Sequence, residues 1–147
     1  MLDIFNTMNV SASGMTANRL RLDVIADNIA NAETTRTDEG GPYRRKTVAF
    51  SEILKQQMSF AGEIEPSTAS FGGVEVSEIV EDQRPFKMVY DPAHPDANEE
   101  GYVQMPNVNV LREMVDLINA QRAYEANVSS INATKAFASA ALGIGRG

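Results

Sequence analysis

Apolar residues recur at helical spacing through the first thirty residues of the chain. One line repeats every seven residues and consists of Met1, Met8, Met15, Leu22 and Ile29, with Ile4 and Ile25 beside it. This stripe predicts an amphipathic helix from Asp3 to Asn31, with the Asp3 carboxylate as its N-cap. Gly14 lies inside the predicted helix, where it marks either a bend or a close approach to another element.

A second helical pattern occupies the C-terminal third. One seven-residue line consists of Val110, Leu117, Tyr124, Ile131 and Ala138, and a partner line of Met114, Gln121, Val128, Lys135 and Leu142. The two lines predict a helix from Asn109 to Leu142, capped by Asn109 and ended by the following glycines. Gln121 and Lys135 interrupt the second line, so the pattern is that of a coiled-coil-like seam with polar positions.

The region between these helices has a different pattern. All six prolines lie between residues 42 and 106, and apolar residues alternate with polar ones in two runs, 74–80 and 86–90, as in half-buried strands. A turn at 82–84 is predicted between these runs. Further expectations are strands at 47–50 and 102–103, a short helix at 51–58 and a loop at 59–73.

These patterns predict an α+β fold, in which long N- and C-terminal helices form a coiled-coil-like pair around a small β-rich insert. The expected segments are an N-terminal helix (1–35), a loop and β-rich insert (36–106) and a C-terminal helix (107–147). At about 1.5 Å per residue the helices would be roughly 43 and 51 Å long. A compact globule of this length is roughly 38 Å across. Either the helices are broken, or the molecule is elongated and exposes apolar stripes.

Exposed stripes favour a subunit of an assembly over a monomeric enzyme. The alternatives are an ordinary amphipathic helix that packs on its own core and a self-contained adaptor whose two helices pair with each other on the β unit. The predicted assembly interface consists of Met8, Met15, Leu22, Ile25, Ile29, Val110, Met114, Leu117, Tyr124, Val128, Ile131 and Leu142.

Composition excludes several classes of function. The chain has 147 residues, a net charge of -7, one histidine and no cysteine. Neither a metal site, a cofactor site nor a cysteine nucleophile is therefore expected. The acidic balance argues against a nucleic-acid partner. No stretch is apolar enough for membrane insertion, and the first residues lack the basic region of a cleaved secretory signal. Residues 47–106 carry a net charge of -8, which leaves both helical ends nearly neutral.

Asp91, His94 and Asp96 form the one group of residues with catalytic-looking chemistry. Two carboxylates beside an imidazole suggest a small hydrolase. However, prolines fix this segment as a turn, and no serine or cysteine nucleophile lies at motif spacing. A structural turn is therefore the favoured interpretation, and no catalytic residue is assigned.

The end of the first helix contains a distinctive motif of Asn28, Ile29, Ala30, Asn31 and Ala32, followed by Thr34 and Thr35. The amides of Asn28 and Asn31 share a helix face, where they can bond to the last carbonyls or to a partner helix. Ala26 and Ala30 are small enough to permit close helix approach. This motif resembles the signature of bacterial flagellar rod, hook and hook-associated axial proteins. Glu33 departs from it, since other members often carry Asn or Asp there.

Further segments resemble the proximal rod members of that family: 41–46, 80–82, 85–86, 89–97, 101–103, 105–109, 113–116 and 122–127. The resemblance implies a non-enzymatic structural subunit of the basal-body rod in the periplasm, whose terminal helices form a tube around the export channel. It implies further copies, other rod proteins, basal ring or adaptor proteins and the flagellar export apparatus as partners. It also implies type III export without a cleaved signal peptide.

Overall fold

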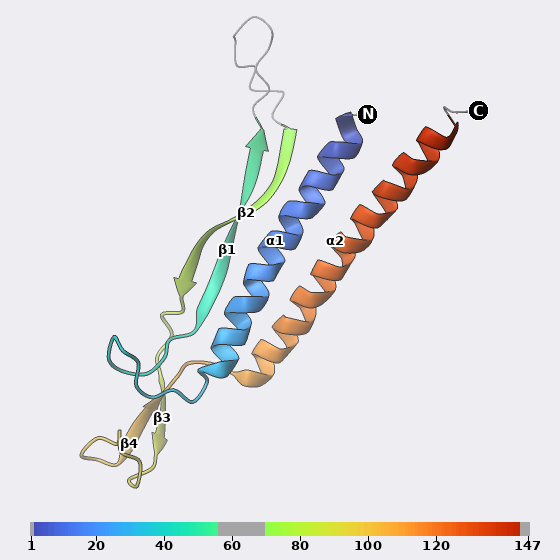
Figure 1. The fold of residues 1–147 in the computed structure, drawn as a ribbon. Coiled ribbons are helices and arrows are strands. Elements are labelled where there is room, and N and C mark those ends of the chain that lie inside the picture. Colours follow the sequence, from blue (N-terminus) through green and yellow to red (C-terminus); the bar gives the residue numbers. More distant parts are fainter. Residues whose placement is uncertain (1, 56–69, 145–147) are drawn as a thin grey trace, which may run out of the picture. The chain divides into compact units, whose positions relative to one another are not determined.

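The computed structural model describes residues 2–55 and 70–144 (Figure 1). Its elements in chain order are α1 (Leu2–Ala30), β1 (Lys46–Lys55), β2 (Ser70–Glu81), β3 (Lys87–Tyr90), β4 (Tyr102–Met105) and α2 (Val110–Ile144). Two long helices therefore enclose a small β insert in the sequence. This order confirms the α+β fold that was expected from the hydrophobic pattern.

Both helices extend close to their predicted bounds. The prediction that Asp3 caps the first helix is wrong, because α1 already begins at Leu2. The cap on the second helix is confirmed, since Oδ1 of Asn109 accepts a hydrogen bond from the backbone N–H of Arg112 at 3.1 Å. Gly14 does not end or break α1, which continues to Ala30.

The four strands form two separate two-stranded sheets, β1 with β2 and β3 with β4. In the second sheet the strands are antiparallel, with Lys87 opposite Met105 and Tyr90 opposite Tyr102. The two tyrosine rings meet edge to face, with 5.2 Å between centroids. The predicted strand at 102–103 is confirmed, and the one at 47–50 lies within β1.

The predicted turn at 82–84 falls in the segment that separates β2 from β3, but the two strands do not pair with each other. β2 instead pairs with β1, and the backbone N–H of Asp82 donates to the carbonyl of Arg45 at 2.8 Å. β3 finds its partner further along the chain, because the turn at 91–101 returns it to β4. Alternation predicted both strands correctly but contained no information about their partners.

The predicted helix at 51–58 is also wrong as far as the structure describes it. Residues 51–55 continue β1, and the Ser51 hydroxyl donates to the Glu75 carboxylate of β2. Residues 56–58 lie outside the described part of the chain. The predicted loop at 59–73 begins outside it as well, and its last residues, 70–73, belong to β2.

The chain divides into two compact units. Unit 1 comprises residues 1–19, 50–77 and 121–147, and unit 2 comprises residues 20–49 and 78–120. In unit 1, α1 and α2 contact each other at Ser11, whose hydroxyl donates to that of Ser130. Gly14 confirms a close approach there, because an added Cβ would lie only 3.0 Å from the Asn127 amide nitrogen.

Unit 2 contains most of the small apolar core. Its buried apolar side chains are Val24, Ile25, Tyr43, Val103, Pro106 and Ala120. Ala17 is the one buried apolar side chain among the described residues of unit 1. Hydrophobic burial within a single chain is therefore concentrated in unit 2.

Candidate assembly site: a buried polar centre and exposed helix faces

Asn28 lies at the middle of a buried polar network in unit 2, and its side chain is fully enclosed. Its Nδ2 donates to the Lys46 carbonyl at 2.8 Å and to Oε2 of Glu113 at 3.0 Å. Its Oδ1 accepts from the Tyr43 hydroxyl at 3.0 Å and from the Lys46 N–H at 2.9 Å. Because an amide has two donors and two acceptor lone pairs, every hydrogen-bonding position of Asn28 is used.

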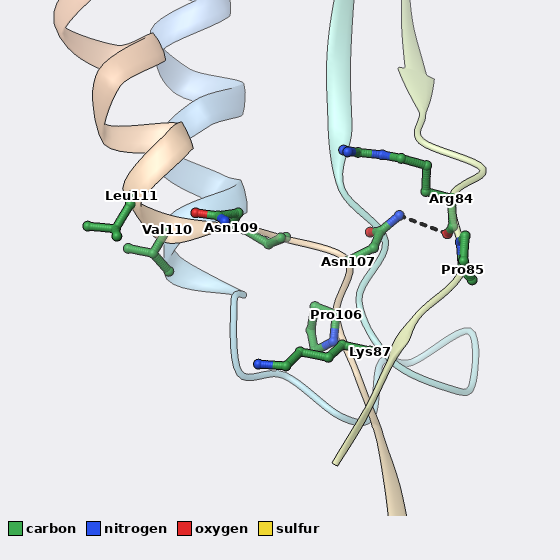
Figure 2. A pocket seen from close by; sticks show the side chains of 9 residues that line it. Arg84, Pro85, Lys87, Pro106, Asn107, Asn109, Val110 and Leu111 are labelled. Carbon is green, nitrogen blue, oxygen red and sulfur yellow. Dashed lines mark hydrogen bonds between the residues drawn. The ribbon is translucent and has the colours of Figure 1, made fainter.

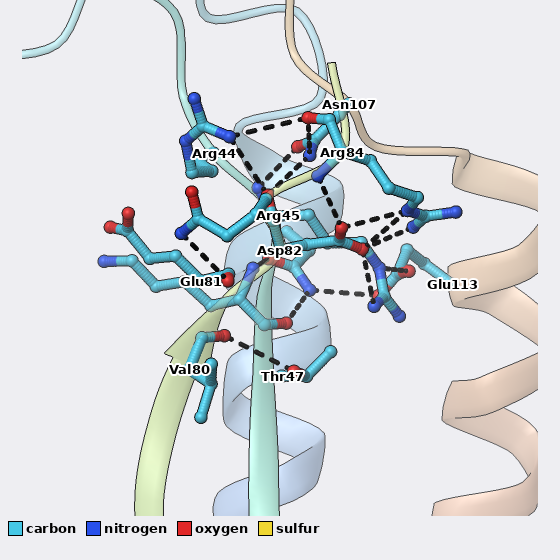
Figure 3. Close-up of polar contacts among 12 residues, drawn as sticks. Arg44, Arg45, Thr47, Val80, Glu81, Asp82, Arg84, Asn107 and Glu113 are labelled. Carbon is cyan, nitrogen blue, oxygen red and sulfur yellow. Dashed lines mark hydrogen bonds and ion pairs between the residues drawn. The ribbon is translucent and has the colours of Figure 1, made fainter. Parts of the chain in front are cut away.

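Glu113 is the buried anion of this network, with no exposed surface. Its Oε1 accepts from Nε of Arg45 at 2.7 Å, while its Oε2 accepts from Asn28. Arg45 also lies 3.7 Å from the carboxylate of Asp82 (Figure 3) and 3.7 Å from that of Asp116. A buried carboxylate with this pairing ties α2 to α1 and to the start of β1. We call Asn28, Tyr43, Arg45, Asp82 and Glu113 the polar centre.

Two members of the polar centre have shifted acidities. Hydrogen bonds from the Arg84 side chain and backbone N–H hold the pKa of Asp82 at about 2, below its usual 3.8. Burial raises the pKa of the Tyr43 hydroxyl, with smaller contributions from the charges of Asp27 and Glu113. Asp82 is therefore charged and Tyr43 neutral near pH 7, as their hydrogen bonds require.

The other motif residues shape the exit from α1. The Asn31 side-chain amide donates at 2.9 Å to the Asp27 carbonyl, which also accepts from the Asn31 backbone N–H at 3.0 Å. The Thr34 hydroxyl donates to the Asn31 side chain, and its carbonyl accepts from the Tyr43 N–H. We expected the two asparagine amides to bond either the last carbonyls of the helix or a partner helix. Asn31 does the first, and Asn28 does the second. Ile29 and Ala32 are half-buried, and Ala30 is exposed.

The turn that resembled a catalytic group is held by bonds among its own residues and to Thr35. Nδ1 of His94 accepts from the Asp96 backbone N–H at 3.1 Å. The Asp96 carboxylate accepts from the Thr35 hydroxyl at 2.9 Å and lies 3.5 Å from Arg36. Asp91 accepts from the Ala93 N–H. These contacts match the structural interpretation of the turn.

The structure places the predicted interface residues in three environments. Ile25 is buried in the core of unit 2. Val110, Met114 and Leu142 are exposed. The remaining eight are half-buried, namely Met8, Met15, Leu22, Ile29, Leu117, Tyr124, Val128 and Ile131. Most residues of the seven-residue lines on α2 are therefore already partly covered by their own chain.

Sequence reasoning placed Met114 in the interface but missed the other three residues of a second apolar face on α2. Leu111, Met114, Val115 and Ile118 are all about half exposed or more, and their spacing of three and four residues places them on one side of the helix. Phe137 is also exposed, further along α2. The apolar residues at 111, 115 and 118 have helical spacing and could have predicted this face. The seven-residue lines were the more regular pattern and were used instead.

An open pocket of about 640 Å³ adjoins this face (Figure 2). Asn107 is one of its lining residues, and its side chain donates to the Arg84 carbonyl at 3.1 Å. Its lining combines apolar and basic residues: Arg84, Pro85, Lys87, Pro106, Asn107, Val108, Asn109, Val110 and Leu111. Leu111 belongs to both the pocket and the exposed face.

Within the described ranges, no group of three or more His, Asp or Glu side chains is arranged to hold a metal ion. Neither described helix has the length and apolar character needed to cross a bilayer.

Comparisons with known proteins match both terminal regions. The model of the family described as "Flagella basal body rod protein" matches residues 8–36. The model described as "Flagellar basal body rod FlgEFG protein C-terminal" matches residues 99–144. The first match contains Asn28 and the second contains Glu113, so the two helical sides of the polar centre lie in matched regions.

Whole-chain relatives agree with these matches. The flagellar basal-body rod protein FlgC of Bacillus subtilis is 50% identical over 97% of this chain and 98% of its own length. FlgC of Borreliella burgdorferi is 45% identical over 99% and 100%. FlgC of Escherichia coli O6:H1 is 40% identical over 97% and 98%.

The terminal helices and the matched regions define a class of protein, the axial structural proteins of the bacterial flagellum. Within that class, the chain belongs to the FlgC family of flagellar basal-body rod proteins.

Proposed function

We propose that the chain is a structural subunit of the flagellar basal-body rod that assembles through its terminal helices. The near full-length likeness to rod proteins of the FlgC family carries this proposal. Other rod components are its partners, and its role is mechanical rather than enzymatic.

The distribution of apolar surface supports assembly through the helices. Val110, Met114 and Leu142 of the predicted interface are exposed, as are Phe5 and Phe137. Exposed large apolar residues gathered along helix faces are typical of surfaces that another protein covers. Burial of one such side chain stabilises an interface by roughly 1.5–3 kcal/mol.

The finer assignment follows from the resemblance to proximal rod proteins. The terminal segments, 1–35 and 107–147, would line the drive shaft around the export channel, and segment 36–106 would meet other rod, ring or adaptor proteins. The acidic charge of the middle region, -8 over residues 47–106, keeps such a chain soluble before assembly. The subunit would act in the periplasm and leave the cytoplasm through the flagellar export apparatus without cleavage.

The proposal is tested in a bacterium whose own copy of this chain is deleted. The wild-type chain should restore swimming and should be detected in purified basal bodies. Met114→Asp and Leu142→Asp should abolish both, while the circular dichroism spectrum and melting of the purified variants stay unchanged. Asn132→Asp, a change at another exposed position of α2, is the matched control, and a strain with this variant should swim normally. Absence of the wild-type chain from basal bodies would overturn the proposed function.

A further inference from the structure

Unit 2 exposes an apolar surface on the first turns of α2 that its own chain does not cover. Leu111 is 77% exposed and Val115 is 56% exposed, with Met114 and Ile118 beside them. We call these four residues the apolar face. All four project from the part of α2 that belongs to unit 2, and Leu111 also lines the adjoining pocket.

Unit 2 exposes a second surface of opposite character on the last turns of α1. Asp23, Ala26, Asp27 and Ala30 are exposed and follow one another at three- and four-residue spacing. We call these four residues the acidic face. Within the described chain, neither carboxylate has a hydrogen-bonding or ion-pairing partner. The two alanines leave the helix backbone accessible between the charges.

The charges around the apolar face complement the acidic face. Arg112 follows Leu111 of the apolar face on α2 and is exposed. Lys87 lines the adjoining pocket (Figure 2). Both side chains are exposed, and neither forms an ion pair with another described residue. A helix that carries two carboxylates flanking small residues would pair its charges with these cations and seat the apolar side chains on its alanines.

We propose that the apolar face of one copy packs on the acidic face of a second copy. Arg112 and Lys87 lie opposite Asp23 and Asp27 in this contact. The inference rests on the proposed rod function and names the surfaces through which copies meet. Because the two faces differ, the contact is heterologous, and each added copy leaves a new face free for the next. Copies joined in this way form a ring or an open helical series.

Crosslinking in assembled rods tests the pairing, because the natural chain contains no cysteine. Ala26→Cys and Val115→Cys are introduced singly and together, and purified basal bodies are treated with a short bismaleimide. The double variant should give a ladder of crosslinked copies, whereas each single variant should give monomer only. The matched control combines Ala26→Cys with Glu99→Cys, an exposed position in the turn before β4, and should give no ladder.

Two results would overturn the pairing while the rod function stands. One is a double variant that is present in basal bodies but forms no ladder. The other is a dimer formed by Val115→Cys alone, which would mean that two apolar faces meet each other. A crosslink from Val115→Cys to a different rod protein would mean that this protein, and not a second copy, covers the apolar face. That result would also overturn the pairing.

A mixing experiment with the full purified chain tests the pairing even if the cysteine variants do not incorporate into basal bodies. Asp23→Lys/Asp27→Lys disables the acidic face, and Ile118→Asp disables the apolar face. In sedimentation, each variant should self-associate at least roughly tenfold more weakly than wild type. Their equimolar mixture should form a dimer that does not grow, because only one intact pair of faces remains.

The mixing experiment has its own control and its own contrary results. Glu99→Lys/Glu100→Lys makes the same charge change in an exposed turn and should associate like the wild-type chain. Wild-type protein that stays monomeric at every concentration would contradict the pairing of copies. A mixture that stays monomeric, while wild type associates, would contradict the choice of faces.

Discussion

Among single residues, Asn28 has the largest structural role, because one amide joins three parts of unit 2. Its four hydrogen bonds reach Tyr43, the backbone of Lys46 and the carboxylate of Glu113. Glu113 in turn holds Arg45. A fully satisfied buried network of this kind fixes one arrangement of its elements, since any shift leaves a buried polar group without a partner.

Asn28→Ala should lower the free energy of unfolding by about 3 kcal/mol. The substitution leaves the Lys46 N–H and the Tyr43 hydroxyl without their acceptor in a buried position. Urea unfolding of the purified chain measures the loss. Asn119→Ala, at an exposed position on α2, is the control and should change stability by less than about 0.5 kcal/mol. Equal midpoints for the two variants would contradict the role given to Asn28.

A second residue-scale prediction concerns acid stability. The pKa of Asp82 is about 2 in the folded chain, against its usual 3.8. Between these two pH values the folded chain therefore binds fewer protons at Asp82 than the unfolded chain does. Its stabilising contribution is therefore present above about pH 4 and is lost as the pH falls through about 2.

Asp82→Asn removes this contribution at neutral pH, by about 1 kcal/mol once solvent screening of the exposed Arg84 is considered. Melting temperatures should differ most between wild type and variant at pH 6 and should converge toward pH 2. Glu99→Gln, an exposed carboxylate near β4, is the matched control. A constant difference across the whole pH range would show that Asp82 acts through packing instead.

For the elements, periodicity predicted the helices well and gave no prediction of which strands pair. The apolar repeat gave both helices within a few residues, because helix formation depends on local spacing. Pairing of β2 with β1 depends on contacts between residues distant in sequence, which alternation does not encode.

The seven-residue pattern also did not predict which residues at the start of α2 face the core. Its innermost residues in unit 2 are Glu113 and Ala120, a charged residue and a small one. The larger apolar residues Leu111 and Val115 point away from the core. On the first turns of α2, the usual rule that large apolar residues face inward therefore fails, although Leu117 is half-buried. A helix that buries a glutamate and leaves large apolar residues on its outer side is typical of a subunit that completes its packing by assembly.

Gly73 provides a test of how β2 meets α1 in unit 1. Its φ is +123°, and an added Cβ would overlap the hydroxyl of Ser13. That hydroxyl donates to the Val10 carbonyl at 2.7 Å and accepts from the Val74 N–H at 3.1 Å. Gly73→Ala should therefore lower stability by about 2 kcal/mol and accelerate hydrogen exchange at the Val74 amide.

Gly41→Ala separates backbone strain from the overlap. Gly41 also has positive φ, at +79°, but an added Cβ would meet nothing within 4 Å. It should cost only about 1 kcal/mol and should leave exchange at Val74 unchanged. If both variants behave alike, the close approach of β2 to α1 contributes nothing beyond the glycine conformation.

For the whole molecule, burial predicts that the isolated chain is unevenly stable. Buried apolar side chains and the polar centre lie in unit 2, whereas Ala17 is the single buried apolar residue among the described residues of unit 1. Local opening requires less free energy where fewer contacts are lost. Amides of residues 20–28 and 113–120 should therefore exchange at least roughly tenfold more slowly than those of 4–16 and 128–142 in the dilute chain.

Assembly should remove this difference, because neighbouring subunits would cover exposed residues of unit 1 such as Phe5 and Phe137. Hydrogen exchange is measured on the dilute chain and on purified basal bodies, and the Asn28→Ala chain serves as a control in which unit 2 loses its advantage. Uniform protection along both helices in the dilute chain, together with one cooperative melt, would favour a self-contained helical adaptor. Protection that appears in 4–16 and 128–142 only within basal bodies would mean that the subunit's own residues supply one part of its core and its neighbours supply the other.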